Sequence, residues 1–309
     1  MKLSDRAKKI LSVVLASLAL MLVADLIVTK IVYDSVFCRF DDPGTPPIDE
    51  MGIGECEGTE FISGDNLLSG WLFSRGEDLV VIAQGINSEA SYFCDEAEYF
   101  LSEGFSVFIF DMTGSGESSG DSAVGFSQSV YDLRAALDHI ENKYEFDDIF
   151  LLGHSRGAYA ALCMLGDGRD IAGVVSINGI NSAMEAVITP AEEKMGAFAY
   201  ANYPMLWIYQ SLLFDRETVS LSCADLIGNS SVPVLVIHAE DDETVPADRG
   251  SVMACRDEVY RNGAEFISVP GGHTSVFEDG DGGANDSLME KICDFFYKHT
   301  EREVSVNEG

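Results

Sequence analysis

The sequence predicts an α/β protein with a doubly wound, mostly parallel sheet and a small helical cap, preceded by one N-terminal transmembrane helix. Three observations predict it. From about residue 58, short continuous apolar runs alternate with segments whose apolar residues recur at helical spacing. Between residues 180 and 229 this alternation is interrupted by a segment rich in aromatic residues and methionine. Residues 10–33 are apolar over a length that can cross a bilayer.

The N-terminal segment is interpreted as an uncleaved signal anchor, residues 10–33, behind a basic cytoplasmic tail, residues 1–9. The run from Ile10 to Ala24 contains no charge, and apolar character resumes after Asp25. A cleaved signal peptide is the alternative, but it needs a small-residue cleavage site where this apolar stretch continues. Basic residues before the span and acidic residues after it place the N-terminus in the cytoplasm. We therefore expect a single-pass protein of the cell membrane with an extracytoplasmic domain.

Residues 34–57 are predicted to form a Pro-rich linker, because Asp41–Pro47 holds three of the eight prolines. The main domain is expected at residues 58–300, with a tail at 301–309. The domain opens with an antiparallel pair, Thr59–Ile62 and Leu67–Phe73. Buried strands are then expected at Leu79–Ala83, Phe105–Phe110, Ile149–Leu152, Ala172–Ile177, Val234–Ile237 and Phe266–Val269. Helices are expected at Tyr92–Ser102, Ser127–Asn142, Ala158–Leu165 and Ser287–His299.

Residues 180–229 are interpreted as the cap. The segment is too long for a plain crossover connection and too apolar for a disordered loop. Its large apolar residues are Met184, Met195, Phe198, Tyr200, Tyr203, Met205, Trp207, Tyr209 and Phe214. Most of them are expected to pack the cap onto the sheet. Some are expected to line an acyl pocket, because ligand sites are mostly apolar concavities.

Charge and cysteine content exclude two classes of function. Nineteen Lys and Arg against 52 Asp and Glu give a formal net charge of −33, which repels nucleic acid and keeps the protein soluble. The seven cysteines show no C-x-x-C pair or Cys/His cluster, so no metal site is expected. Most are expected to be free thiols in the core, with a Cys38–Cys56 disulfide as a minor alternative.

The strongest chemical signal is Gly153-His154-Ser155-Arg156-Gly157, which matches G-x-S-x-G. The pentapeptide occurs often by chance, but here it follows an apolar strand and precedes a small-residue helix, which is the context that the motif requires. The flanking glycines let strand and helix approach closely. The sequence therefore predicts Ser155 as a catalytic nucleophile.

A serine hydroxyl needs an adjacent base, and the chain offers five histidines. His139 is read as a surface side chain, His299 as distant, His154 as a packing or supporting group and His238 as structural. His273 follows the last strand in a glycine-containing loop, and the order Ser, acid, His along the chain supports it as the general base. The acid is expected in the loop after His238, where residues 240–243 are four consecutive acidic residues. Their chemistry alone does not identify which of them orients the histidine.

With these motifs, residues 58–299 resemble the α/β-hydrolase fold superfamily. Within it, the chain is similar to the membrane-anchored bacterial serine hydrolases that are grouped with prolyl oligopeptidase-like peptidases and esterases. In the superfamily, the turn that carries the catalytic acid commonly has the sequence His-Gly-x-x-Asp-x-x-Val-Pro. His238, Val245 and Pro246 match it, which selects Asp242, with Asp241 as the alternative. Residues 111–118 resemble the superfamily's Asp-x-x-Gly-x-Gly-x-Ser turn, which shapes the site without a catalytic role.

The resemblance also implies an oxyanion hole made by two backbone N–H groups, those of Arg156 and Ile86. The loop that carries Ile86 usually begins His-Gly in the superfamily, whereas this chain has Gln84-Gly85. That departure leaves the backbone donor in place and puts the loop's supporting hydrogen bonds in question.

The implied chemistry is acyl transfer to water through an acyl-enzyme on Ser155, with no metal or organic cofactor. We expect the substrate to be a small-molecule carboxylic ester. A serine peptidase acting on short peptides is the alternative enzyme, and a non-catalytic, membrane-tethered binding module is the alternative from another class.

Overall fold

The computed structural model describes residues 4–259, 263–278 and 283–300. Residues 1–3 of the predicted basic tail and the predicted tail at 301–309 lie outside these ranges. Within them, the strands are β1 Glu57–Ser63, β2 Asn66–Phe73, β3 Leu79–Ala83, β4 Ser106–Phe110, β5 Ile149–His154, β6 Gly173–Ile177, β7 Val234–Ala239 and β8 Glu265–Val269. The α-helices are α1 Asp5–Val36, α2 Cys94–Ser102, α3 Phe126–Lys143, α4 Arg156–Cys163, α5 Ala183–Met195, α6 Tyr203–Leu213, α7 Arg216–Val219, α8 Cys223–Asn229, α9 Arg256–Val259 and α10 Asp286–Lys298.

The predicted doubly wound, mostly parallel sheet is confirmed. The strands described form one sheet in the order β1-β2-β4-β3-β5-β6-β7-β8. β1 pairs antiparallel with β2 and β2 with β4, while all the other pairs are parallel. The carboxyl ends of β3, β5, β6 and β7 therefore meet along one edge of the sheet, where open α/β sheets bind ligands.

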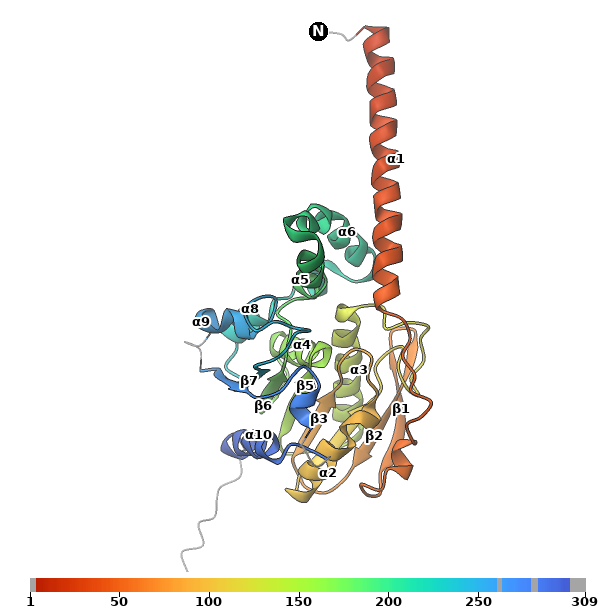
Figure 1. The fold of residues 1–309 in the computed structure, drawn as a ribbon. Coiled ribbons are helices and arrows are strands. Elements are labelled where there is room, and N and C mark those ends of the chain that lie inside the picture. The colour runs from red at the N-terminus through yellow and green to blue at the C-terminus, as the bar shows by residue number, and fades with distance from the viewer. Residues whose placement is uncertain (1–3, 260–262, 279–282, 301–309) are drawn as a thin grey trace, which may run out of the picture.

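Both faces of the sheet are covered, as continuous apolar strands predict (Figure 1). Successive side chains of a strand point to opposite faces. Leu79 and Val81 of β3 accordingly join the core formed with α3, α4 and α8, whereas Val80 joins the core formed with α2 and α10. α8 lies in the predicted cap range, but Ala224 and its neighbours pack on α4 as part of the sheet domain.

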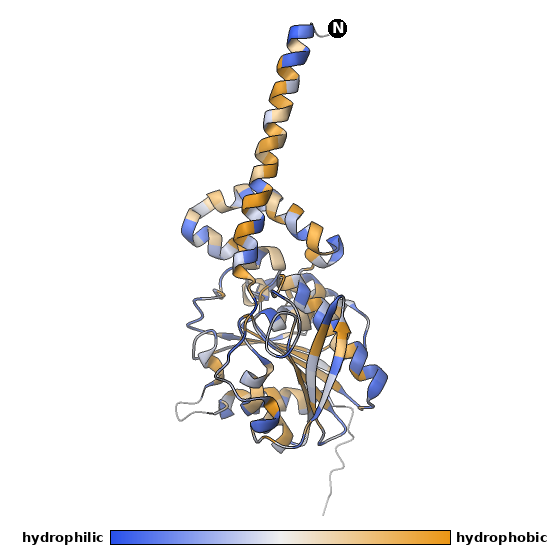
Figure 2. Ribbon diagram, turned by 90° about the vertical axis from the view of Figure 1, so that its right-hand side faces the viewer, coloured by the Kyte–Doolittle hydropathy of each residue, from blue (hydrophilic) through white to orange (hydrophobic). Residues whose placement is uncertain are grey.

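α1 is a single 32-residue helix that is long and apolar enough to cross a membrane, and a signal sequence would meet the same criterion. Residues 10–24 are exposed along its free part. Its last turns are different, because Tyr33 and Phe37 are buried against the cap helices and α3. Figure 1 shows α1 rising beyond the domain with the cap helices beside its lower part, and Figure 2 colours most of this helix orange, as hydrophobic.

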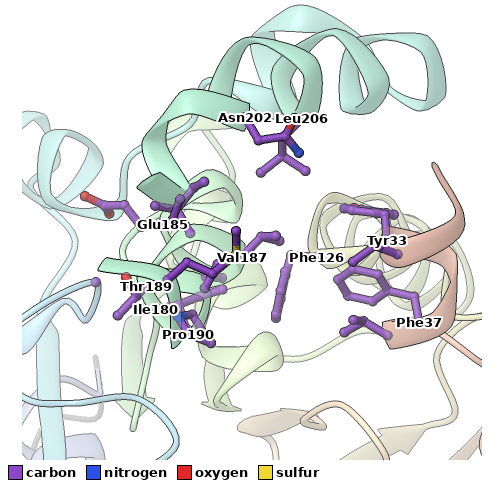
Figure 3. Close-up of a pocket in the computed structure, with 18 of the residues that line it drawn as sticks. Tyr33, Phe37, Phe126, Ile180, Glu185, Val187, Thr189, Pro190, Asn202 and Leu206 are labelled. Carbon is purple, nitrogen blue, oxygen red and sulfur yellow. The ribbon is translucent and has the colours of Figure 1, made fainter. Parts of the chain in front are cut away.

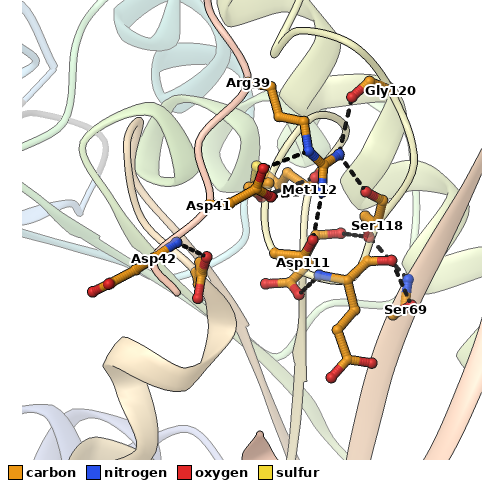
Figure 4. A network of polar contacts seen from close by, with 12 residues as sticks. Arg39, Asp41, Asp42, Ser69, Asp111, Met112, Ser118 and Gly120 are labelled. Atoms are coloured by element: carbon orange, nitrogen blue, oxygen red, sulfur yellow. Dashed lines mark hydrogen bonds and ion pairs between the residues drawn. The ribbon is translucent and has the colours of Figure 1, made fainter. Parts of the chain in front are cut away.

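The N-terminal part of the predicted Pro-rich linker, residues 34–57, is packed against the domain. Residues 34–36 continue α1, and the chain after them is fastened to the domain through backbone bridges at Cys38 and Phe40. Arg39 donates hydrogen bonds to the carbonyl oxygens of Gly116, Ser118 and Gly120 at 2.6–3.0 Å (Figure 4). Proline content alone predicts stiffness and does not report these tertiary contacts. The Cys38–Cys56 alternative is wrong, because both thiols are free.

Candidate active site

Ser155 stands on a strained turn between β5 and α4. Its backbone has φ 53° and ψ −112°, a conformation that costs a non-glycine residue on the order of 1–3 kcal/mol. A Cβ on Gly157 would lie 1.9 Å from the Ala83 carbonyl oxygen, and one on Gly153 would lie 2.4 Å from the Gly157 carbonyl oxygen. The two glycines of the motif are therefore required by close packing around the serine, as the sequence predicts.

Asp242 and His273 form a hydrogen-bonded pair at the same edge of the sheet. His273 Nδ1 lies 2.7 Å from Asp242 Oδ2, and the other carboxylate oxygen accepts the backbone N–H groups of Thr244 and Val245 at 2.9 and 2.8 Å. Burial alone would raise the pKa of Asp242, but these hydrogen bonds outweigh it and hold the pKa below its ordinary value. The alternative acid, Asp241, is exposed, so the geometry favours Asp242.

The loop that carries His273 is held by two side chains. The His273 carbonyl oxygen accepts hydrogen bonds from His154 Nε2 and Asn178 Nδ2, each at 2.8 Å. Burial, together with the neighbouring His273, lowers the pKa of His154 to about 3, so His154 is neutral and acts as a donor. Within the described residues no hydrogen bond joins the Ser155 hydroxyl to His273. Such contacts are commonly long without substrate and tighten when it binds.

The remaining histidines have structural surroundings. His238 Nε2 lies 2.9 Å from the Val245 carbonyl oxygen and so supports the turn of Asp242. His139 is partly exposed, and its ring stacks on Phe61 at 5.2 Å. In the part of the chain that the structure describes, no cluster of His, Cys, Asp and Glu is suited to hold a metal ion.

The loop that carries Ile86 has its own supports. Gln84 is buried and donates hydrogen bonds to the Ser88 carbonyl oxygen at 3.0 Å and to Ser115 Oγ at 2.7 Å. Arg156 Nη2 donates to the Gly85 carbonyl oxygen at 3.1 Å. Burial lowers the pKa of Arg156 to about 10, which leaves the guanidinium charged at neutral pH. Gln84 stands where the superfamily usually has histidine, and its hydrogen bonds support the loop in place of that histidine.

A cavity of about 720 Å³ opens above Ser155. Ile86 and Val245 line it near the serine, and residues of the cap line it farther out. In Figure 3, Tyr33 of α1 and Phe37, the residue after α1, face Ile180 and Pro190 across the space. The lining is mostly apolar and its volume is within the ordinary range for small-molecule sites.

Two features of the site were missed from the sequence. Asn178 bridges the loops, since its Oδ1 accepts the Ala239 N–H at 2.8 Å while its Nδ2 holds His273. The available signal was its position just after a buried strand. α1 also contributes a wall of the cavity, and its signal was the spacing of Asp25, Thr29 and Tyr33, which places three less apolar residues on one face of an apolar helix.

Comparisons with known proteins agree with this architecture. A family described as serine aminopeptidase, S33, matches residues 75–220, just under half of the chain, and that range includes Ser155 but ends before Asp242 and His273. Protein phosphatase methylesterase 1 of Candida albicans is 26% identical over 148 residues, and the match spans 46% of this chain and 41% of that protein. The chain thus covers less than half the length of this curated relative.

Solved structures give broader coverage. An esterase of Pyrococcus furiosus superposes with a TM-score of 0.64 at 18% identity, covering 85% of this chain and 99% of that one. An acylaminoacyl peptidase of Pyrococcus horikoshii superposes with a TM-score of 0.57 at 18% identity, covering 82% of this chain and 43% of that one. At such identities the likeness shows the fold.

Proposed function

We infer that this chain, which has the α/β-hydrolase fold, is a serine hydrolase that cleaves carboxylic esters. The observation that carries the proposal is the 2.7 Å contact between His273 Nδ1 and Asp242, at the sheet edge where Ser155 holds its strained turn. A structural role would explain either feature alone. An oriented imidazole at the same sheet edge as a serine on a strand-to-helix turn supports acyl transfer.

The proposed reaction has two steps. His273 Nε2 takes the Ser155 proton as Oγ attacks the ester carbonyl, and Asp242 orients the imidazole and stabilises its charged form. In this proposal the backbone N–H groups of Arg156 and Ile86 receive the oxyanion. The alcohol leaves with the proton from His273, and water then releases the acid from the acyl-enzyme.

A peptidase is the second candidate, favoured by the S33 match and the acylaminoacyl peptidase neighbour. An aminopeptidase must hold the substrate's α-ammonium group, and Glu185 is a carboxylate in the cavity lining. Glu185 already accepts hydrogen bonds from Asn181 at 2.8 Å and Ser182 at 3.1 Å. The mostly apolar lining supports an acyl group instead, so we rank the ester first.

We also propose that α1 is retained as a membrane anchor, with the domain outside the cytoplasm. A cleaved signal peptide would contribute nothing to the folded domain. Tyr33 and Phe37 are instead 3% and 1% exposed, packed against Tyr209 and Phe126. The basic residues that precede the apolar stretch support a cytoplasmic N-terminus.

The test is fluorophosphonate labelling of the full chain and of Ser155→Ala, followed by a panel of 4-nitrophenyl esters and aminoacyl amides. We expect labelling and ester hydrolysis that both disappear in Ser155→Ala. Faster hydrolysis of the amides, lowered selectively by Glu185→Gln, would support the peptidase. Absence of Ser155-dependent labelling would leave the non-catalytic binding module as the explanation.

A further inference from the structure

The cavity above Ser155 is shared between the catalytic edge and the anchor helix. Seven of its lining residues come from the end of α1 and the residue after it: Asp25, Val28, Thr29, Val32, Tyr33, Val36 and Phe37. They recur at intervals of three and four, so they occupy one face of the helix. Ser155 and Ile86 line the other end of the same cavity. One continuous space thus joins the nucleophile to the side of the membrane-anchor helix.

The height of the membrane along α1 follows from its length. A hydrocarbon core of about 30 Å takes roughly 20 helical residues, so a span that starts at Ile10 reaches about Thr29. Ile10–Ala24 alone, at about 22 Å, is too short. The outer rim of the cavity, at Asp25 and Val28, therefore lies within the outer edge of the hydrocarbon layer.

A polar cluster marks the same level independently. Directly beyond Thr29, Lys30 pairs with Asp34, and Tyr209 of α6 donates to Asp34 Oδ1 at 2.6 Å. Charged and tyrosine side chains of this kind gather where a helix leaves the bilayer. α6 lies beside α1 at this height (Figures 1 and 2).

The cap presents apolar side chains toward solvent near this level. Phe198 is 72% exposed, Leu212 is 69% exposed, and Met195, which also lines the cavity, is 56% exposed. Met195 ends α5, Phe198 follows it and Leu212 lies on α6, so exposed apolar groups are spread over the cap. Because α1 anchors the cap beside the bilayer, a lipid surface fits these side chains.

We propose that the substrate is a long-chain acyl ester resident in the outer leaflet, whose acyl chain enters the cavity from the bilayer along α1. The inference rests on the proposed esterase function and adds its substrate class. The ester carbonyl reaches Ser155 while the chain stays between α1 and α5. Ser155 Oγ forms the acyl bond as the ester C–O bond breaks, the alcohol takes the proton from His273, and water yields the free acid.

The test uses the full chain in phosphatidylcholine vesicles with 4-nitrophenyl acetate and 4-nitrophenyl hexadecanoate. Val32→Trp fills the α1 wall of the cavity, and Ile31→Trp is the matched control, because Ile31 is a neighbouring exposed aliphatic residue outside the described lining. We expect Val32→Trp to lower kcat/KM for the hexadecanoyl ester by about tenfold or more and to spare the acetyl ester. Ile31→Trp is expected to leave both unchanged.

Equal behaviour of the two variants, or an equal loss on both esters in Val32→Trp, would overturn the inference while the esterase function stands. If the wild type hydrolyses neither ester, the proposed function fails and a binding readout decides the substrate site. A photoreactive long-chain alcohol in the vesicles should then crosslink to α1 and α5 of Ser155→Ala, and Val32→Trp in that background should abolish the crosslink. No crosslink would refute the site.

Discussion

At the scale of single residues, the role of the Asp242 carboxylate can be tested directly against that of its neighbour Asp241. Its carboxylate contacts His273, whereas its neighbour Asp241 is exposed. Asp242→Asn keeps the side-chain shape and removes the charge that orients the imidazole. We expect kcat for a short ester to fall by about 10³- to 10⁴-fold. Asp241→Asn, which changes the charge equally, should leave kcat unchanged, and a larger loss in that variant would reverse the assignment.

Glu96 gives a prediction on pH and stability. Its side chain on α2 is 3% exposed, and burial raises its pKa from 4.5 to about 7. The folded state then holds a proton that the unfolded state releases, so stability is full below the unfolded pKa and is lost as pH rises through the folded one. Between about pH 4.5 and pH 7 the loss is on the order of 3 kcal/mol.

Urea unfolding of the wild type and Glu96→Gln, at about pH 5 and about pH 8, measures this effect. The variant should lack Glu96's part of the decline and be the more stable protein at the higher pH. A decline will persist in the variant, because burial also raises the pKa of Asp111 to about 7. Identical pH dependence in the two proteins would show that Glu96 ionises without cost.

At the scale of elements, the strands were predictable because burial on both faces requires a continuous run of apolar residues. Leu79–Ala83 is continuous in apolar residues, and the structure places β3 at those bounds. Ser155 and its two glycines were predictable for a related reason, since the turn and the close packing demand those residue types. Local sequence carries this information because the constraint itself is local.

The elements that were missed depend on contacts distant in sequence. Arg39 binds carbonyl groups about 80 residues away, and Asn178 binds His273 from 95 residues away. The apolar periodicity of a single sequence does not reveal such long-range contacts. The prediction of a signal anchor at residues 10–33 does not reveal that the end of α1 packs on α6, because the apolar character that suits a bilayer also suits such packing.

At the scale of the whole molecule, charge and anchorage act in opposite directions. A formal net charge of −33 repels the domain from anionic lipid surfaces. α1 counters this by packing directly into the domain rather than joining it through a free linker. With α1 retained as the proposed anchor, this packing would hold the cap at the bilayer in one orientation, which a flexible tether would not achieve.

Two truncations separate the anchoring role of α1 from its structural role. Removing residues 1–24 deletes the free part of the helix, and the remaining domain should be soluble with the stability of the full chain. Removing residues 1–37 also deletes Tyr33 and Phe37, whose burial contributes about 1.5–3 kcal/mol each. That protein should unfold at a lower temperature and self-associate through the uncovered faces of Leu206 and Tyr209. Thermal unfolding and size-exclusion chromatography compare the two, and equal stability would show that α1 only anchors the domain.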